Sequence, residues 1–364
     1  MVSLSPTIGK IFGIPIQLHW TFLGLMLLAL ILLATSPGGL FFFALLVLLF
    51  VCVLIHELAH SVVAIRNDIK VKKIILLPIG GASIIDFTKV KPGKELKISL
   101  AGPLTSIALG LIFVPFYLIA PGAGILKQGL QFLFEINLLL GVFNLLPGFP
   151  LDGGRVLRSY LERRHSPLDS TKIAVKASNI VVVGIVVGTI IYAAVIPNAT
   201  FTYREFLVLF DVIIALFLYD GAKAELQSAI FKSRARNVAA ADAATKNFIL
   251  VTPQMRLSSL YKEMVRKGTN IVLLKKGNRF FAFSGRLSAN SDMGDHTISE
   301  KEGTMFKSEV PKIDGGRKLS DAIELMQVEE KNTVVVIKNK RLVGVLYAPY
   351  VEAAIQLYLS KKKQ

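Results

Sequence analysis

Residues 40–63 read LFFFALLVLLFVCVLIHELAHSVV, and no charged residue occurs between Leu40 and Ile55. A helix needs about 20 mostly apolar residues to cross the hydrocarbon of a bilayer, so this stretch predicts a membrane span. His56, Glu57 and His60 fall inside that span. Ionisable side chains are costly in lipid and usually serve a function there. The stretch therefore predicts both a membrane fold and a site within it.

The rest of the chain contains further apolar stretches of similar length. The mean hydropathy is +0.57 and 53% of the residues are hydrophobic, which is high for a soluble protein. The predicted spans are 17–35, 40–65, 97–120, 126–149, 173–196 and 204–222. The sequence thus predicts a polytopic α-helical membrane protein of about six spans, followed by a soluble region.

The basic residues are unevenly distributed among the predicted loops. Lys and Arg are frequent in 66–97 and 155–176, whereas 36–39, 121–128 and 197–205 carry very few. Cytoplasmic loops of membrane proteins are enriched in Lys and Arg. We therefore expect both termini in the cytoplasm.

The chain is basic overall, with a formal net charge of +17. A basic chain can bind nucleic acid, but no nucleic-acid recognition motif accompanies the charge. Positive charge next to spans is typical of cytoplasmic loops that face anionic lipid. We therefore expect the lipid bilayer, and no nucleic acid, as a partner.

The HELAH sequence has the spacing of a metal site. His56 and His60 are four residues apart and share one helix face, so both can bind the same ion. Neutral imidazoles suit zinc, and catalytic zinc commonly has three protein ligands and one open position. Glu57 lies on an adjacent face, where it can act as general base toward water activated by the metal.

The third ligand has to come from another segment, and Asp152 is the best candidate. His56 lies 16 residues into its span, or about 24 Å from the outer end, in the cytoplasmic half of the bilayer. The span 126–149 runs in the same direction and ends in NLLPGFPLDGGR, residues 144–155. Asp152 is thus expected at the same depth as the histidines. The alternative is a Pro-Gly turn with an incidental Asp.

Two other features near these residues suggest roles in catalysis. Asn144 could donate a hydrogen bond to a developing oxyanion, or its amide could simply pair with the helix backbone. Residues 74–86, IILLPIGGASIID, predict a short hairpin or re-entrant segment that turns at Gly80-Gly81. Its free edge could pair with an extended peptide, or the hairpin could be only structural.

Together HELAH and NLLPGFPLDGG, with GGAS (80–83) and AGP (101–103), resemble the site-2 protease family of intramembrane zinc metalloproteases. The resemblance covers roughly residues 10–220. It implies one Zn²⁺ per chain held by His56, His60 and Asp152, with Glu57 as general base. It also implies regulated intramembrane proteolysis, the cleavage of membrane-spanning protein substrates.

The C-terminal region contains an internal duplication. Residues 248–285 and 306–352 each place a helix, LSSLYKEM or LSDAIELM, before a β-rich run, NIVLLKKGNRFFAF or NTVVVIKNKRLVGVLY. The repeat predicts a pseudo-symmetric α/β pair, similar to the CBS modules of one branch of the family. The expected domains are 1–222 (membrane metalloprotease), 223–247 (linker), 248–300 (first CBS-like module) and 301–364 (second).

The CBS resemblance leaves the role of this pair open. CBS pairs often bind adenine nucleotides through a hydroxyl residue and an Asp after the last strand. Here Tyr347 and Tyr350 occupy those places, so a homodimer contact or regulation without a ligand is the alternative.

Two other functions compete with proteolysis. A CBS-regulated transporter or channel usually has repeated halves, and we find no repeat within residues 1–219. A non-catalytic membrane scaffold leaves Glu57 beside the histidines unexplained.

Overall fold

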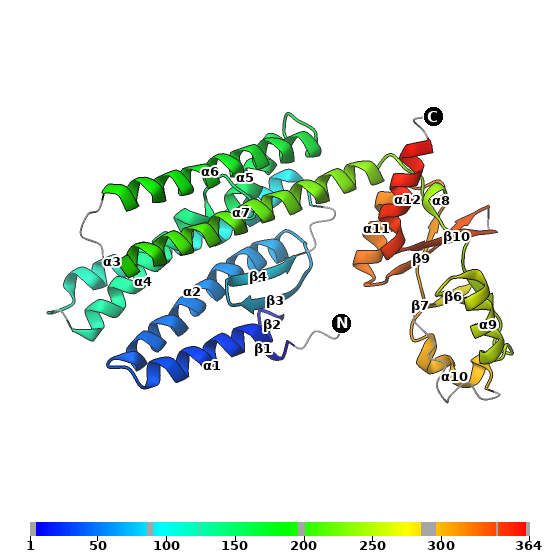
Figure 1. Ribbon diagram of the computed structural model, residues 1–364, viewed down its shortest axis with the longest axis horizontal. Helices are drawn as coiled ribbons and strands as arrows, with labels where there is room; N and C mark the ends of the chain where they lie inside the picture. The colour runs from blue at the N-terminus through cyan, green and yellow to red at the C-terminus, as the bar shows by residue number, and fades with distance from the viewer. Residues whose placement is uncertain are drawn as a thin grey trace. The chain divides into compact units, whose positions relative to one another are not determined.

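The computed structural model describes residues 5–85, 90–122, 124–195, 201–284, 296–339 and 341–361. The chain divides into two compact units, Met1–Ala229 and Ile230–Gln364. Figure 1 shows the helices and strands of both.

Helices make up most of the first unit. In chain order they are α1 (Trp20–Ala34), α2 (Gly39–Arg66), α3 (Pro92–Ile119), α4 (Ile125–Asn144), α5 (Asp152–Leu161), α6 (Pro167–Val195) and α7 (Phe201–Ala235). Among the described residues, α2, α3, α4 and α6 are long and apolar enough to cross a membrane. Large apolar side chains such as Ile119 and Ile180 are exposed on them. Exposed apolar surface of this extent indicates contact with lipid.

Each predicted span coincides with a helix, but some ends differ. The span predicted at 17–35 is the 15-residue helix α1, because residues 14–18 form a strand instead. The helix α4 ends at Asn144, five residues before the predicted end. Pro147 disfavours helical backbone at the residue before it and cannot donate an intrahelical hydrogen bond. A loop, residues 145–151, therefore separates α4 from α5.

A four-stranded sheet accompanies these helices, in the order β1-β2-β3-β4. The strands are β1 (Thr7–Ile11), β2 (Ile14–Leu18), β3 (Val71–Leu77) and β4 (Gly80–Ile85). The strands β3 and β4 form the hairpin predicted at 74–86, and β2 pairs with β3 in parallel. The hairpin turns at Pro78-Ile79 rather than at Gly80-Gly81. Asp86 lies outside the described residues.

The N-terminal elements pack against α2, the helix that carries His56 and His60. Phe22 of α1, Phe50 and Val53 of α2 and Leu76 of β3 form one buried cluster. The rings of Phe22 and Phe50 meet edge to face with centroids 4.6 Å apart. This packing fixes α2 one turn before His56, where a displacement would carry over to the site.

The second unit repeats one βαββ pattern. Its elements are α8 (Ala240–Ala243), β5 (Ile249–Val251), α9 (Leu257–Lys267), β6 (Ile271–Lys276), β7 (Arg279–Ser284), α10 (Ile298–Met305), β8 (Lys312–Asp314), α11 (Leu319–Val328), β9 (Thr333–Lys338), β10 (Arg341–Tyr347) and α12 (Ala348–Lys361). In each sheet the first two strands are parallel and the last two antiparallel. The predicted fold class, a helical membrane protein followed by a soluble α/β pair of repeats, is confirmed.

The join between the two parts of the chain is helical. The helix α7 runs through to Ala235, and Ala235 and Val238 belong to a buried core of the second unit. Most of the segment expected as a linker, 223–247, is therefore helix, in α7 and α8. The residue boundaries given for the four domains stay a prediction.

Candidate metal centre

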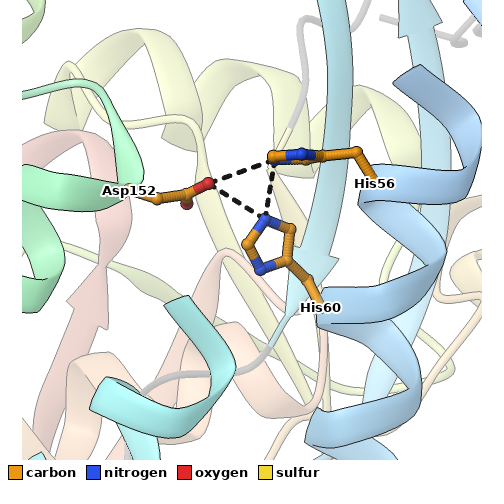
Figure 2. Close-up of side chains that lie close together, drawn as sticks. All are labelled: His56, His60 and Asp152. Carbon is orange, nitrogen blue, oxygen red and sulfur yellow. Dashed lines mark hydrogen bonds and ion pairs between the residues drawn. The ribbon is translucent and has the colours of Figure 1, made fainter. Parts of the chain in front are cut away.

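The histidine pair and Asp152 meet in the interior of the first unit. His56 and His60 project from α2, and Asp152 is the first residue of α5 (Figure 2). Asp152 Oδ2 lies 3.2 Å from His56 Nε2 and 3.0 Å from His60 Nε2. The two Nε2 atoms are 3.1 Å apart. One atom of each of the three side chains, from two segments about 90 residues apart in the sequence, thus lies next to the other two.

The helix α3 fixes the orientation of both imidazole rings. His60 Nδ1 donates a hydrogen bond to the carbonyl oxygen of Ile98 at 2.7 Å, and His56 Nδ1 lies 3.0 Å from Ser106 Oγ. A proton held on Nδ1 leaves the Nε2 lone pair free for a metal. His60 therefore has the tautomer that a ligand needs, and both rings direct Nε2 toward Asp152.

A glycine of α3 leaves room for the converging atoms. A Cβ placed on Gly102 would lie 2.2 Å from His60 Nε2 and 2.6 Å from His56 Nε2. Real Cβ atoms do not approach so closely, and the nearby atoms belong to buried rings that are held on their other side. Only glycine fits at this position next to the histidines.

The set of donor atoms fits a zinc ion. Two imidazole nitrogens and a carboxylate oxygen lie within 4.8 Å of one another, and the histidines are only 4% and 6% exposed. Nitrogen and oxygen ligands of this kind, three in number, are typical of catalytic zinc.

Glu57 contacts the hairpin rather than the histidines. The hydroxyl of Ser83, on β4, donates a hydrogen bond to Glu57 Oε2. A Cβ on Gly81 would lie 2.5 Å from Glu57 Cγ, so β4 approaches the carboxylate closely only because Gly81 lacks a side chain. The predicted hairpin thus forms one wall beside the predicted general base.

Asn144 is the last residue of α4, and its amide donates to the carbonyl oxygen of Leu140 at 2.8 Å. This contact is the backbone pairing considered as the alternative for Asn144. A role as oxyanion donor stays a prediction.

The glycines after Asp152 fold α5 back onto the preceding loop. A Cβ on Gly153 would lie 2.2 Å from the carbonyl oxygen of Leu146, and one on Gly154 would lie 2.7 Å from the backbone of Gly148. The amide of Phe149 donates to Ser178 Oγ of α6 at 2.7 Å. The loop and the first turn of α5 therefore form one packed arm that carries Asp152.

Several known proteins are similar to this chain in sequence. Residues 44–130 and 122–188 match the model of peptidase family M50. A zinc metalloprotease of Methanocaldococcus jannaschii, MJ0392, is 32% identical over 312 residues, which are 84% of this chain and 82% of that protein. The chain belongs to peptidase family M50. The family resemblance and the prediction of a metalloprotease are confirmed, and with the apolar helices of the first unit they make the chain an integral membrane protein.

Other similar proteins match shorter parts of this M50 peptidase. The putative zinc metalloprotease Rip3 of Mycobacterium tuberculosis is 36% identical over 47% of each chain. A solved site-2 protease from M. jannaschii is 36% identical and covers 61% of this chain and 95% of its own, with a TM-score of 0.43. A CBS domain of a bacterial CNNM/CorC Mg²⁺ transporter covers 40% of this chain at 9% identity and a TM-score of 0.29. The names of these M50 relatives agree with the zinc predicted from the histidines.

The sequence did not reveal the residues that support the site. Ser83 lies in the predicted hairpin 74–86, and Gly102 and Ser106 lie in the predicted span 97–120, but no motif distinguishes them from their neighbours. Their signal was weak, since small residues in a span usually indicate close helix packing.

Proposed function

We propose that this M50 peptidase is an intramembrane zinc endopeptidase that cleaves membrane-spanning segments of protein substrates. The observation that carries the proposal is the convergence of His56, His60 and Asp152 between helices that have the length and composition of membrane spans.

His56, His60 and Asp152 would hold a single zinc ion. When bound, zinc polarises a scissile carbonyl and makes water acidic enough to deprotonate near neutral pH. The chain supplies the rest: Ile98 and Ser106 hold the direction of the two imidazole rings, and Gly102 keeps the space in front of them open.

Glu57 would accept the proton of the attacking water as general base. It follows His56 directly on α2, and the hydrogen bond from Ser83 limits the directions in which its carboxylate can turn. A general base must lie within hydrogen-bond reach of the proton it removes. Asn144 would donate its second amide hydrogen to the oxyanion that forms on the substrate.

The hairpin offers a way to present a substrate peptide. Within the described residues, the sheet order leaves β4 at an edge with β3 as its one partner. An extended peptide could pair with this edge, next to the carboxylate of Glu57. A helical substrate hides its peptide bonds in intrahelical hydrogen bonds, so the segment to be cut would have to unwind first.

The orientation of the spans follows from the loops. The basic segments 66–97 and 155–176 would face the cytoplasm, together with both termini. The metal centre then lies in the cytoplasmic half of the bilayer, and cleavage would release a cytoplasmic fragment.

The second unit would regulate the protease or dimerise it. It contains a cavity of about 470 Å³ whose lining includes Thr245, Thr269, Tyr347 and Tyr350. No Lys or Arg is among the described residues that line it. The tyrosine rings could stack on a base, but phosphates would meet no cation, so regulation by contact with another protein chain is favoured over binding of an adenine nucleotide.

The proposal is tested with full-length protein reconstituted in liposomes with a membrane-spanning model substrate. Glu57→Gln should retain one zinc per chain, measured by elemental analysis, and lose cleavage. Glu135→Gln is the matched control, because Glu135 is an exposed carboxylate on α4 that bonds to Gln131, and it should cleave normally.

Cleavage by Glu57→Gln at the rate of the unmodified protein would refute the assignment of the base. Absence of zinc from the purified, active protein would refute the metal centre. Movement of solute across the liposome membrane that persists in a His56→Ala variant would favour the transporter alternative.

A further inference from the structure

Arg158, in the last turn of α5, joins three helices of the membrane unit. Its guanidinium forms ion pairs with Glu95 of α3 and Glu225 of α7. The Arg158 side chain is 17% exposed and that of Glu95 is 9% exposed. Burial disfavours the charge, but Glu95 and Glu225 hold the pKa of Arg158 above its ordinary value. Arg158 is therefore an internal tie between helices rather than a solvated surface group.

The helix α7 also contacts the loop that precedes Asp152. A Cβ on Gly221 would lie 2.6 Å from Pro150 Cδ, so the helix and the loop approach closely. Ala222 lies in the same buried cluster as Phe149. The guanidinium carbon of Arg158 in turn lies over the ring of Phe149, 5.5 Å from the ring centroid. Residues 221–225 of α7 thus contact both the loop before Asp152 and the side chain of Arg158.

The residues of the loop and of α5 that make these contacts flank Asp152 in the sequence. Pro150 precedes it by two residues, and Arg158 follows it by six, about 9 Å along the helix axis. The helix α5 has only ten residues, so a tilt at Arg158 moves its first turn as well. Metal–ligand distances in proteins keep to within about 0.2 Å of their standard values. A small displacement of α5 would therefore weaken the grip of Asp152.

We propose that Arg158 is a positioning residue for Asp152: through its pair with Glu225 it lets α7 fix the carboxylate against the histidine pair. This inference rests on Asp152 being a metal ligand, as the proposed function has it. The helix that carries Glu225 is also the one that continues into the second unit, where Ala235 is part of the core. The helix that carries Glu225 is thus covalently continuous with the second unit, and the ion pair joins that helix to α5, which begins with Asp152.

The test uses full-length protein in detergent and the variants Arg158→Met, Arg158→Lys and Glu225→Gln. Asp169→Asn is the matched control, because it removes an exposed ion pair, with Lys172, on α6. Two quantities are measured: the zinc Kd by competition with a chelator, and the visible spectrum of the cobalt-substituted protein, which reports ligand geometry. Neither quantity depends on turnover.

Arg158→Met and Glu225→Gln should raise the zinc Kd about tenfold or more, as loss of residues that support a ligand does, and should change the cobalt spectrum. Arg158→Lys should have an intermediate effect, because one ammonium cannot replace both arms of the guanidinium. Asp169→Asn should leave both quantities unchanged.

Folded Arg158→Met with the Kd and spectrum of the unmodified protein would overturn the inference, whatever happened to its melting temperature. If that variant does not fold, Glu225→Gln and Arg158→Lys decide in the same way. Asp152→Asn separates this inference from the proposed function. If it binds zinc as tightly as the unmodified protein, the metal centre is wrong; if it does not, and the Arg158 and Glu225 variants do, only the positioning role fails.

Discussion

His60 Nδ1 donates to the carbonyl oxygen of Ile98 at 2.7 Å, and this bond ties α2 to α3. A backbone carbonyl remains whatever residue stands at position 98, so substitution of a side chain on α3 does not remove this partner of His60. His56 depends instead on a side chain, Ser106 Oγ, at 3.0 Å. The two histidines therefore differ in how far substitution on α3 can disturb them.

Ser106→Ala should weaken zinc binding by about tenfold, because the His56 ring loses the partner of its Nδ1 and the preference for the ligand tautomer. The measurement is the zinc Kd by chelator competition. Ser99→Ala is the control, since Ser99 is also buried on α3 but its hydroxyl has no hydrogen-bond partner. Equal Kd values for the two variants would show that Ser106 does not orient His56.

Gly102→Ala should abolish zinc binding while most of the fold is retained. The added methyl would occupy the space in front of both Nε2 atoms, 2.2 Å from that of His60. Zinc content after purification and the melting temperature check this. Gly93→Ala adds the same methyl group to α3 at a place with open space, and it should keep its zinc. Full zinc occupancy in Gly102→Ala would mean that the metal binds elsewhere.

Gly81→Ala should separate metal binding from catalysis. The methyl would lie 2.5 Å from Glu57 Cγ and push either the carboxylate or β4 away. A misplacement of about 1 Å near a reacting group can cost about 100-fold in rate, so cleavage should fall by about that factor with zinc retained. Gly129→Ala, in open space on α4, is the control. Unchanged cleavage would show that the hairpin does not position the general base.

How far the site could be predicted depends on whether its residues lie near one another in the sequence. His56, Glu57 and His60 share two turns of helix, so their spacing alone indicated the metal. Asp152 was predicted because two spans place it at the depth of the histidines. Ser106, by contrast, supports His56 from 50 residues away, and no local pattern records which small residue of a span faces a ligand.

The fold shows the same division. Apolar length predicted the helices, because lipid requires it of each span separately. The strand β2 pairs with β3 across more than 50 residues, and the five-residue strand β1 is too short to show a period. Helix ends were less certain where proline acts before the apolar run stops, as at Pro147 after Asn144. Strand register and helix ends depend on contacts with segments that are distant in the sequence, and the local pattern does not predict those contacts.

Removal of the metal should destabilise the protein by a predictable amount. A ligand present at 100 times its Kd stabilises the folded state by about 2.7 kcal/mol. Treatment with a zinc chelator should therefore lower the melting temperature and stop cleavage, and added zinc should restore both. Asp152→Asn should show a smaller thermal response to zinc. A melting temperature that does not depend on zinc in the unmodified protein would argue against a site built from these three residues.

Binding to the cavity of the second unit should depend on phosphate charge. The described lining residues include the carboxylate of Asp242 and no Lys or Arg, so each phosphate added to a nucleoside loses hydration without gaining an ion pair. Tyr347 and Tyr350 meet edge to face at 5.2 Å, a surface on which a base can lie. Calorimetric titration of the full-length protein should show ATP binding more weakly than adenosine. Tyr350→Ala should remove whatever adenosine affinity exists, whereas Tyr160→Ala, at an exposed tyrosine of α5, should not. Tighter binding of ATP would mean that cations from outside the lining reach the phosphates, and that the second unit senses nucleotide charge after all.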